Sequence, residues 1–260
     1  MSIIQVAKSW LGRGLVTSRL NRVVLGAAGI VVVFHRVNDL LPGDGLTRSS
    51  RDFERFCRFF RSYFDVISLG EHVSRLASER SLAGTLVITF DDGYLDNIEV
   101  AAPILRRFAL PATFFVTTSF IESSIVPWWD AGLARHPGWM SWEQVRSLAA
   151  EGFDIGGHTR THPDLGQIDG EQADLEIAGC RDDLRCELGA PPAHFAYPYG
   201  RVENMRESNR ERVKRAGYHC CVSSFGGISR PPQDPFRLPR VSVDLWHRTP
   251  EQFAFEVLVR

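Results

Sequence analysis

Two adjacent carboxylates, Asp91 and Asp92, occur at the end of an apolar segment in the sequence Thr-Phe-Asp-Asp-Gly. Like charges held this close destabilise each other where the chain is buried, and a nearby cation or a division of roles relieves the repulsion. One carboxylate would then bind a metal ion while the other carries a proton. The competing interpretation is an ordinary turn, in which Asp and Gly are common.

Two imidazoles lie four residues apart, at His158 and His162 in the sequence His-Thr-Arg-Thr-His-Pro. A compact loop or one helical turn can direct both rings at a single cation. One carboxylate and two histidines leave coordination positions open for water and substrate, which is typical of a catalytic metal site. The alternative is a pair of hydrogen-bonded loop histidines.

The polar residues that could do chemistry follow apolar segments typical of strands. His35, Asp91, Asp92, His158 and Tyr199 all stand directly beyond such segments. In a parallel α/β barrel the C-terminal ends of the strands meet on one face, where active sites are built. We therefore expect several separate segments to supply one site.

Apolar, β-rich segments alternate with helical patterns along the whole chain, which indicates a parallel sheet buried on both faces. The predicted strands are Ile30–Phe34, Asp65–Ser68, Thr85–Phe90, Ala112–Thr117, Phe153–Gly156, His194–Ala196 and Tyr218–Val222. The predicted helices are Ser50–Tyr63, Leu69–Ala77, Ile98–Phe108, Ser141–Ala150, Gly170–Leu188, Asn204–Ala216 and Pro250–Leu258. We predict an α/β fold, a single distorted (β/α) barrel of about seven parallel strands with the active site at their C-terminal ends. A doubly wound sheet is the alternative.

The composition is that of a globular chain, with 260 residues, 44% hydrophobic and 23% charged. A formal net charge of -1 provides no overall positive field, which argues against nucleic acid as a partner. The five cysteines lack a Cys-x-x-Cys pair, so reduced thiols that pack in the interior are expected. The oligomeric state is left open.

Three segments, taken in order, resemble the motifs of the polysaccharide deacetylases of carbohydrate esterase family 4. They are Thr-Phe-Asp-Asp-Gly at 89–93, His-Thr-Arg-Thr-His-Pro at 158–163 and Phe-Ala-Tyr-Pro-Tyr-Gly at 195–200. The resemblance extends from about Val31 to Arg240. It implies hydrolysis of an N-acetyl group from an amino sugar in a polysaccharide or lipid-linked glycan.

The resemblance also implies roles for individual residues. Asp91 would be the general base, and Asp92, His158 and His162 would bind a divalent metal ion, with zinc preferred and cobalt or nickel as alternatives. The backbone N–H of Tyr199 would stabilise the oxyanion.

This sequence departs from the family pattern at the expected general acid. Many members carry a late Leu-x-His motif, and after Arg240 the one candidate is His247 in Leu-Trp-His-Arg, which we consider a poor fit. Phe34-His35-Arg36-Val37 instead resembles an element near the N-terminus of a circularly rearranged subgroup that acts on poly-N-acetylglucosamine. We therefore hypothesise that His35 is the general acid. A structural histidine at the end of the strand is the rival interpretation.

The third motif departs as well, since Ala196 stands where the family often has an arginine. Arg240 is a candidate for the missing cation that orients the base. Arg240, Pro198, Tyr199 and Trp129 form our candidate substrate-binding set. Aromatic faces stack on sugar rings, but Trp129 could equally fasten a long loop to the scaffold.

The N-terminal region is basic and partly apolar, and residues 1–38 contain no acidic residue. We predict an amphipathic extension at 1–28 and a catalytic domain at 29–260. The apolar segment Val23–Phe34 has the length of a signal core, but no cleavage site follows it, so a cytoplasmic location at the inner membrane face is expected. Ile3 and Trp10, with basic residues between them, suit either peripheral contact with an anionic membrane or packing on the domain itself.

Two other functions fit the same residues. Hydrolysis of a different non-peptide C–N bond, in a formamide or cyclic amide, would use the same metal chemistry. A non-catalytic carbohydrate-binding module is the other alternative, although the presence of both aspartates and both histidines argues against it.

Overall fold

A computed structural model describes residues 2–41, 43–224, 226–244 and 246–259. Seven parallel strands form a curled sheet in the order β10-β1-β5-β6-β7-β8-β9, and β4 pairs with β5 beside this path. The strands are β1 (Ile30–Phe34), β4 (Asp65–Val66), β5 (Thr85–Phe90), β6 (Thr113–Val116), β7 (Asp154–Gly157), β8 (His194–Ala196), β9 (Cys220–Val222) and β10 (Val241–Ser242). A short ladder joins β2 (Arg36–Val37) to β3 (Thr47–Arg48). The fold is the distorted barrel predicted from the sequence.

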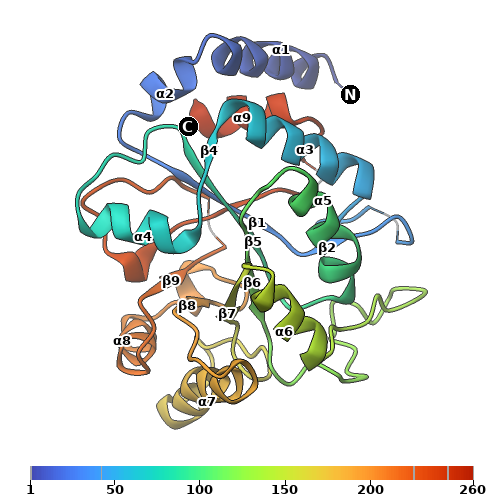
Figure 1. Ribbon diagram of the computed structural model, residues 1–260, viewed down its shortest axis with the longest axis vertical. Helices are drawn as coiled ribbons and strands as arrows, with labels where there is room; N and C mark the ends of the chain where they lie inside the picture. The colour runs from blue at the N-terminus through green and yellow to red at the C-terminus, as the bar shows by residue number, and fades with distance from the viewer. Residues whose placement is uncertain (1, 42, 225, 245, 260) are drawn as a thin grey trace.

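Helices surround the strands (Figure 1). They are α1 (Ile3–Thr17), α2 (Leu20–Leu25), α3 (Ser50–Tyr63), α4 (Leu69–Ala77), α5 (Ala102–Arg107), α6 (Trp142–Ala150), α7 (Gly170–Leu188), α8 (Glu207–Arg215) and α9 (Pro250–Leu258). A π-helical turn, η1 (Asn97–Ala101), leads into α5, and two short 3-10 helices are η2 (Val202–Asn204) and η3 (Pro235–Arg237).

The core is built from aromatic side chains of α3 and the central strands. Phe53, Phe56 and Phe60 repeat at helical spacing, and all three are buried. The Phe34 and Phe90 rings stack at 5.6 Å across β1 and β5, and Phe53 meets Phe34 edge to face at 5.1 Å. Burying this much aromatic surface fixes β1 and β5 relative to each other. These are the strands that end at His35 and Asp91.

Most predicted elements occur where the sequence pattern placed them, and the differences lie at their ends. The strand predicted to reach Ser68 stops at Val66, because the Ser68 side chain accepts a hydrogen bond from Glu71 N–H and caps α4. The helix predicted from Asn204 begins at Glu207, after the turn η2. Strand β10 was not predicted, since two residues are too few to show a period.

The N-terminal residues form two helices that pack beside α9 (Figure 1). Lys8 Nζ lies 2.8 Å from Glu256 Oε1, and the Ser9 and Thr249 hydroxyls are 2.8 Å apart. The apolar segment Val23–Phe34 is divided between the end of α2 and strand β1. No helix in the described part of the chain is long and apolar enough to cross a bilayer. The domain division after residue 28 stays a prediction.

The five cysteines are free in the structure, in agreement with the sequence. Four are buried, and Cys186 on α7 is exposed. Burial raises the pKa of the Cys180 thiol to about 12, so this thiol is uncharged at neutral pH. Packing is therefore a sufficient account of the buried cysteines.

Candidate active site

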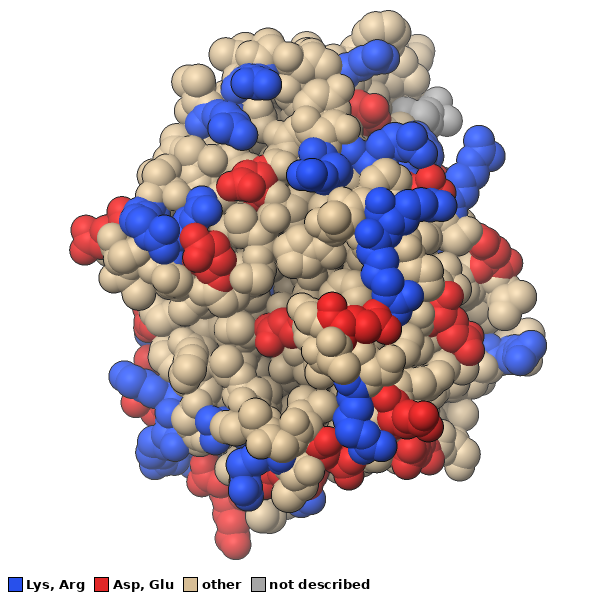
Figure 2. All heavy atoms as spheres, viewed as in Figure 1, with Lys and Arg blue, Asp and Glu red and all other residues tan. Residues whose placement is uncertain are grey.

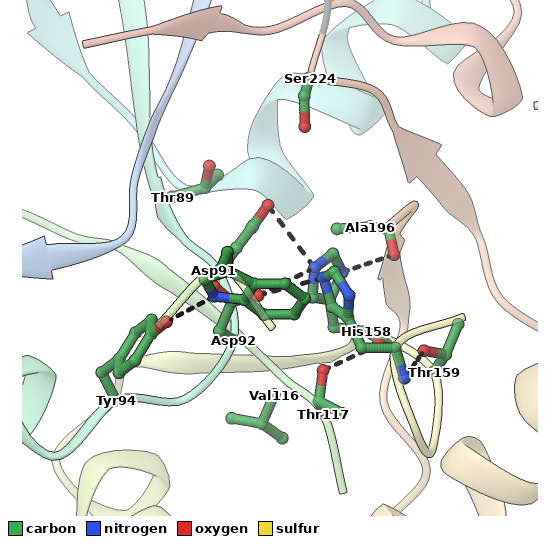
Figure 3. Close-up of polar contacts among 12 residues, drawn as sticks. Thr89, Asp91, Asp92, Tyr94, Val116, Thr117, His158, Thr159, Ala196 and Ser224 are labelled. Atoms are coloured by element: carbon green, nitrogen blue, oxygen red, sulfur yellow. Dashed lines mark hydrogen bonds and ion pairs between the residues drawn. The ribbon is translucent and has the colours of Figure 1, made fainter. Parts of the chain in front are cut away.

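Residues that follow four different strands line one cavity of about 310 Å³. His35 follows β1, Asp91 and Asp92 follow β5, His158 follows β7, and Tyr199 lies beyond β8. Figure 3 shows Asp91, Asp92 and His158 converging at the ends of these strands. The parallel topology thus brings together residues that are far apart in the sequence.

Asp92, His158 and His162 present three ligand atoms within 4.8 Å of one another. Asp92 Oδ1 lies 3.4 Å from Nε2 of each histidine. His158 Nδ1 is 2.8 Å from the Ala196 carbonyl oxygen, so Nδ1 donates there and Nε2 keeps its lone pair for the cluster.

Asp92 Oδ1 is buried and has no hydrogen-bond partner. Such an atom is costly unless something else satisfies it. One carboxylate oxygen and two imidazole nitrogens are ligands that a divalent ion prefers, and three protein ligands leave a position for water. The donor set therefore fits a catalytic metal ion.

Three of the site residues have a left-handed backbone, with φ of 77° at Asp92, 59° at His162 and 59° at Tyr199. Non-glycine residues in this region cost roughly 1 kcal/mol or more each, and they concentrate at functional sites. Local hydrogen bonds maintain the conformation, since the His162 N–H donates to Thr159 Oγ1 at 3.0 Å. These backbone conformations lower the stability of the fold, and they direct the three side chains toward the cavity.

Asp91 is held by a bidentate ion pair with Arg240. The two guanidinium nitrogens Nη1 and Nη2 lie 2.7 and 2.6 Å from the two carboxylate oxygens. Arg240 also donates to the Ser223 carbonyl at 2.5 Å and to Thr89 Oγ1 at 3.0 Å. Burial by itself would raise the pKa of Asp91, but Arg240 and then His158 outweigh it and lower that pKa. Asp91 is consequently an ionised, oriented carboxylate.

His35 lines the cavity, and Asn97 fixes its backbone by donating to its carbonyl oxygen at 2.7 Å. Burial lowers the pKa of His35, while the charges of Asp92 and Asp91 act in the opposite direction and only partly compensate. A neutral imidazole at neutral pH must gain a proton before it can donate one. Asp91, on the same cavity, is the neighbouring group that would collect a proton from water.

Aromatic side chains form one wall of the cavity. Trp128, Trp129 and Tyr199 all line it. The Trp129 ring packs at 4.6 Å on the His162 ring, and the Tyr199 ring packs on the same imidazole at 5.0 Å. Such a wall suits the apolar face of a sugar ring.

A buried polar network holds Trp129 in place. Its Nε1–H donates to Tyr94 Oη at 2.9 Å, and Tyr94 Oη donates to Asp130 Oδ2 at 2.7 Å. Asp130 in turn forms a buried ion pair with Arg36, which also pairs with Asp44 at 2.6 Å. The tryptophan is therefore both fastened to the scaffold and exposed to the cavity, so the two interpretations of it are compatible.

Two members of the candidate substrate-binding set lie elsewhere. Arg240 is fully buried behind Asp91, and neither it nor the buried Pro198 is among the residues that line the cavity. Their role in substrate binding stays a prediction, whereas the contacts of Arg240 agree with its predicted role as the cation that orients the base. The remaining cavity positions, Leu46, Trp128, Ser224 and Ser242, were not among the predicted site residues. Single serines and leucines carry no chemical pattern in a sequence.

Comparison with known proteins supplies the family. Residues 79–221, more than half of the chain, match the family model described as polysaccharide deacetylase. This chain belongs to the polysaccharide deacetylase family. The matched stretch contains Asp91, Asp92, His158 and His162, whereas His35 and Arg240 lie outside it and enter the site from its two flanks.

Individual members of the family and solved structures are similar over much of the chain. YxkH of Bacillus subtilis (strain 168) is 25% identical over 215 residues, 82% of this chain and 70% of that protein. A chitooligosaccharide deacetylase of Bradyrhizobium sp. (strain ANU 289) is 30% identical over 122 residues, 45% of this chain and 46% of that enzyme. The structure of IcaB from Ammonifex degensii is 24% identical, with a TM-score of 0.73 over 90% of this chain and 98% of that one. The last similarity shows a shared fold.

His247, the only late histidine, lies apart from the cavity of this deacetylase family member. Its ring packs at 5.3 Å on Phe253 of α9, and its Nε2 is 3.6 Å from a Glu256 carboxylate oxygen. Its neighbour Leu245 lies outside the described residues. His35 is therefore the histidine that the fold places at the cavity besides the two in the metal-ligand cluster.

Proposed function

We propose that this family member hydrolyses the N-acetyl group of an amino sugar in a polysaccharide or a lipid-linked glycan, using a divalent metal ion bound by Asp92, His158 and His162. The observation that carries the proposal is the unsatisfied Asp92 Oδ1, which faces two imidazole nitrogens beside a carboxylate oriented by Arg240. The similarity to a chitooligosaccharide deacetylase supports the substrate class.

Water attack is the first step that the residues explain. A divalent ion at the cluster would acidify its water and polarise the acyl oxygen. Asp91 takes the proton from the attacking water as the new O–C bond forms, because its carboxylate is ionised and fixed by Arg240. The backbone N–H of Tyr199 is proposed to stabilise the negative charge that develops on the acyl oxygen.

Release of the amine is the second step. The C–N bond breaks as the nitrogen gains a proton, and His35 is the proposed donor, since it lines the same cavity. Because burial lowers the pKa of His35, this imidazole must gain a proton during the reaction before it can donate one, and the proton that Asp91 removes from water balances this step. Acetate and the free amine leave the site, and one water has been consumed.

Metal titration with matched variants tests the proposal. Metal-stripped protein would be titrated with zinc, cobalt and nickel while acetate release from chitooligosaccharides is followed. Asp91→Asn should keep metal and lose about 10²–10⁴-fold in kcat, whereas His158→Ala should also bind metal more weakly. The exposed His219 serves as a control, because His219→Ala removes a histidine outside the cavity.

His35→Ala is a separate arm of this experiment. It should bind metal normally and lose about 10²-fold or more in kcat, because a proton donor to the leaving amine is missing. Near-normal turnover of this variant would end the assignment of His35 as the acid. If the enzyme releases formate from N-formyl substrates and no acetate from N-acetyl substrates, the proposed acyl group would be wrong. The proposed metal site would be unaffected by that result.

The cellular location remains a prediction from the sequence. We propose the inner face of the cytoplasmic membrane, because a lipid-linked precursor made there would present its sugar to the enzyme. Cell fractionation with an antibody to the full chain tests this location.

A further inference from the structure

Helix α1 presents its more apolar side away from the protein. Ile3 is 89% exposed, Trp10 is 70% exposed and Leu11 is 56% exposed. With 3.6 residues per turn, Ile3, Ala7, Trp10 and Gly14 lie along one stripe of the helix, flanked by Ile4 and Leu11. A helix that folds only onto its own domain would direct this stripe inward.

The inner side of α1 meets the domain through polar and small residues along most of its length, and through the buried Val16 near its C-terminal end. Lys8 pairs with Glu256, and Ser9 shares a hydrogen bond with Thr249. A Cβ on Gly12 would lie 1.8 Å from the Glu251 carbonyl oxygen, so the two helices approach closely at this glycine. These contacts fix the orientation of α1, and its apolar stripe remains exposed in the part of the chain that the structure describes.

Helix α2 extends the same end of the molecule. Val23 is 75% exposed, and Leu20 and Val24 are exposed as well. We call the exposed apolar residues of the two helices the apolar end; they are Ile3, Ile4, Val6, Trp10, Leu11, Leu20, Val23 and Val24. In Figure 2 the corresponding upper end of the molecule is mainly uncharged, with lysine and arginine side chains among it and little acidic surface.

The charged residues that α1 and α2 themselves carry are all basic. Arg13 on α1, Arg22 on α2 and Arg19 between the two helices accompany the apolar end, and residues 1–38 contain no aspartate or glutamate. In the described part of the chain, no carboxylate pairs with any of these three arginines. Two copies of the chain joined through this surface would bring like charges together, whereas anionic headgroups would neutralise them.

We propose that the apolar end docks on an anionic lipid bilayer. Helix α1 lies in the plane of the interface, its apolar stripe enters the boundary between headgroups and acyl chains, and the arginines contact the lipid phosphates. The helix stays attached to α9 through its polar side, so the bilayer holds the whole protein without a spanning segment. Vesicle binding is independent of the active site and of the proposed deacetylation.

Co-sedimentation of the full chain with vesicles tests the proposal. The protein should sediment with vesicles of phosphatidylcholine mixed with phosphatidylglycerol and not with phosphatidylcholine alone, and added salt should weaken binding. Leu11→Ser and Trp10→Ser should each weaken binding about tenfold, because an inserted side chain contributes more than 1 kcal/mol. Arg13→Glu and Arg22→Glu should also release the protein.

Matched controls come from the opposite end of the molecule. Leu175 on α7 is 61% exposed, so Leu175→Ser removes an exposed leucine comparable to Leu11. Arg206, exposed beside α8, is the control for the charge reversals. Circular dichroism and a thermal melt check that every variant is folded.

Three outcomes would overturn the proposal. They are absence of binding to anionic vesicles, equal loss in the Leu175→Ser control, and a concentration-dependent dimer in sedimentation velocity that Leu11→Ser abolishes. The last result would identify a second copy as the occupant. Turnover on soluble chitooligosaccharides should be the same for Leu11→Ser as for the wild type.

Discussion

At the scale of single residues, the base and its cation determine how the site responds to pH. Asp91 is deeply buried, and burial favours its neutral form. The charge of Arg240 reverses that preference and lowers the pKa. Asp91, which must be ionised to act as a base, is therefore already ionised below neutral pH.

Arg240→Met tests this dependence. Removing the guanidinium raises the pKa of Asp91, so a larger fraction is protonated at a given pH and the acidic limb of kcat/KM moves to higher pH. Arg240→Lys retains a positive charge and should shift the limb less. The pH profile of metal-loaded enzyme measures both.

The surface Arg237 is a control for Arg240, since Arg237→Met removes an arginine that pairs only at the surface with Glu207 and Asp234. Loss of a buried partner costs about 3–5 kcal/mol in stability, so folding of each variant is checked by denaturation. An acidic limb at the same pH in folded Arg240→Met would show that another group orients and ionises Asp91.

The catalytic and metal-binding candidates were predictable where they directly follow a clearly apolar strand. Asp91, Asp92 and His158 follow apolar strands, and parallel strands bring their ends together. The sequence suggested Arg240 as the cation that orients the base, but its bidentate geometry could not be predicted, because the contact joins positions 149 residues apart and depends on side-chain rotamers. For the same reason the sequence could not separate this role of Arg240 from a role in substrate binding.

At the scale of elements, the loop between β6 and α6 contributes the aromatic wall. Trp128 and Trp129 lie in this loop, and the Tyr94 hydroxyl connects Trp129 to the buried Asp130. The loop is thus anchored beside the metal-ligand cluster instead of covering it loosely. We infer that Tyr94 is a positioning residue for Trp129.

Tyr94→Phe should raise KM for chitooligosaccharides about fivefold and change kcat little, because a hydrogen bond of roughly 1 kcal/mol holds a binding wall and not a reacting group. Steady-state kinetics measure the two constants separately. In a Trp129→Ala background the same substitution should have no further effect on KM.

Tyr63 on α3 offers a control, because its partly buried side chain packs on Phe59 away from the cavity. Tyr63→Phe should leave KM unchanged. An equal rise in KM on adding Tyr94→Phe to Trp129→Ala would show that Tyr94 acts independently of the tryptophan.

Elements with clear periodicity were the most predictable part of the fold. The bounds of α3, α7 and β5 agree with the sequence patterns, since each is long or uniformly apolar. Strand β10 has two residues and exists because β1 pairs with it, so no local signal marks it. The hydroxyl bridge at Tyr94 is likewise a tertiary contact between separate loops.

At the scale of the whole molecule, the N-terminal helices are attached to the barrel through α9. Gly12 is the closest point, where α1 has no side chain and the Glu251 carbonyl fills the space. Sequence periodicity indicated an amphipathic helix but left its orientation open, because either side of α1 could be the packed one. Gly12, the Lys8–Glu256 ion pair and the Ser9–Thr249 hydrogen bond determine which side of α1 packs on α9.

Gly12→Ala should loosen α1 from α9, because the added methyl group would overlap a backbone oxygen. The unfolding free energy should fall by about 1–3 kcal/mol, and amide hydrogen exchange in α1 should become faster. Gly14 has open space around its Cβ position, so Gly14→Ala should raise helix stability slightly. Equal exchange in the two variants would mean that α1 is held by other contacts.

The pairing of β1 with β10 joins segments that lie far apart in the sequence, since Val32 lies in register with Val241. The chain must therefore be synthesised at least as far as Arg240 before His35, Asp91 and Arg240 can meet. Nascent or prematurely terminated chains would contain both aspartates and both histidines and still lack the guanidinium that orients the base. Orientation of the base thus depends on closing a long loop of the chain, and long-range pairings of this kind form more slowly than local ones.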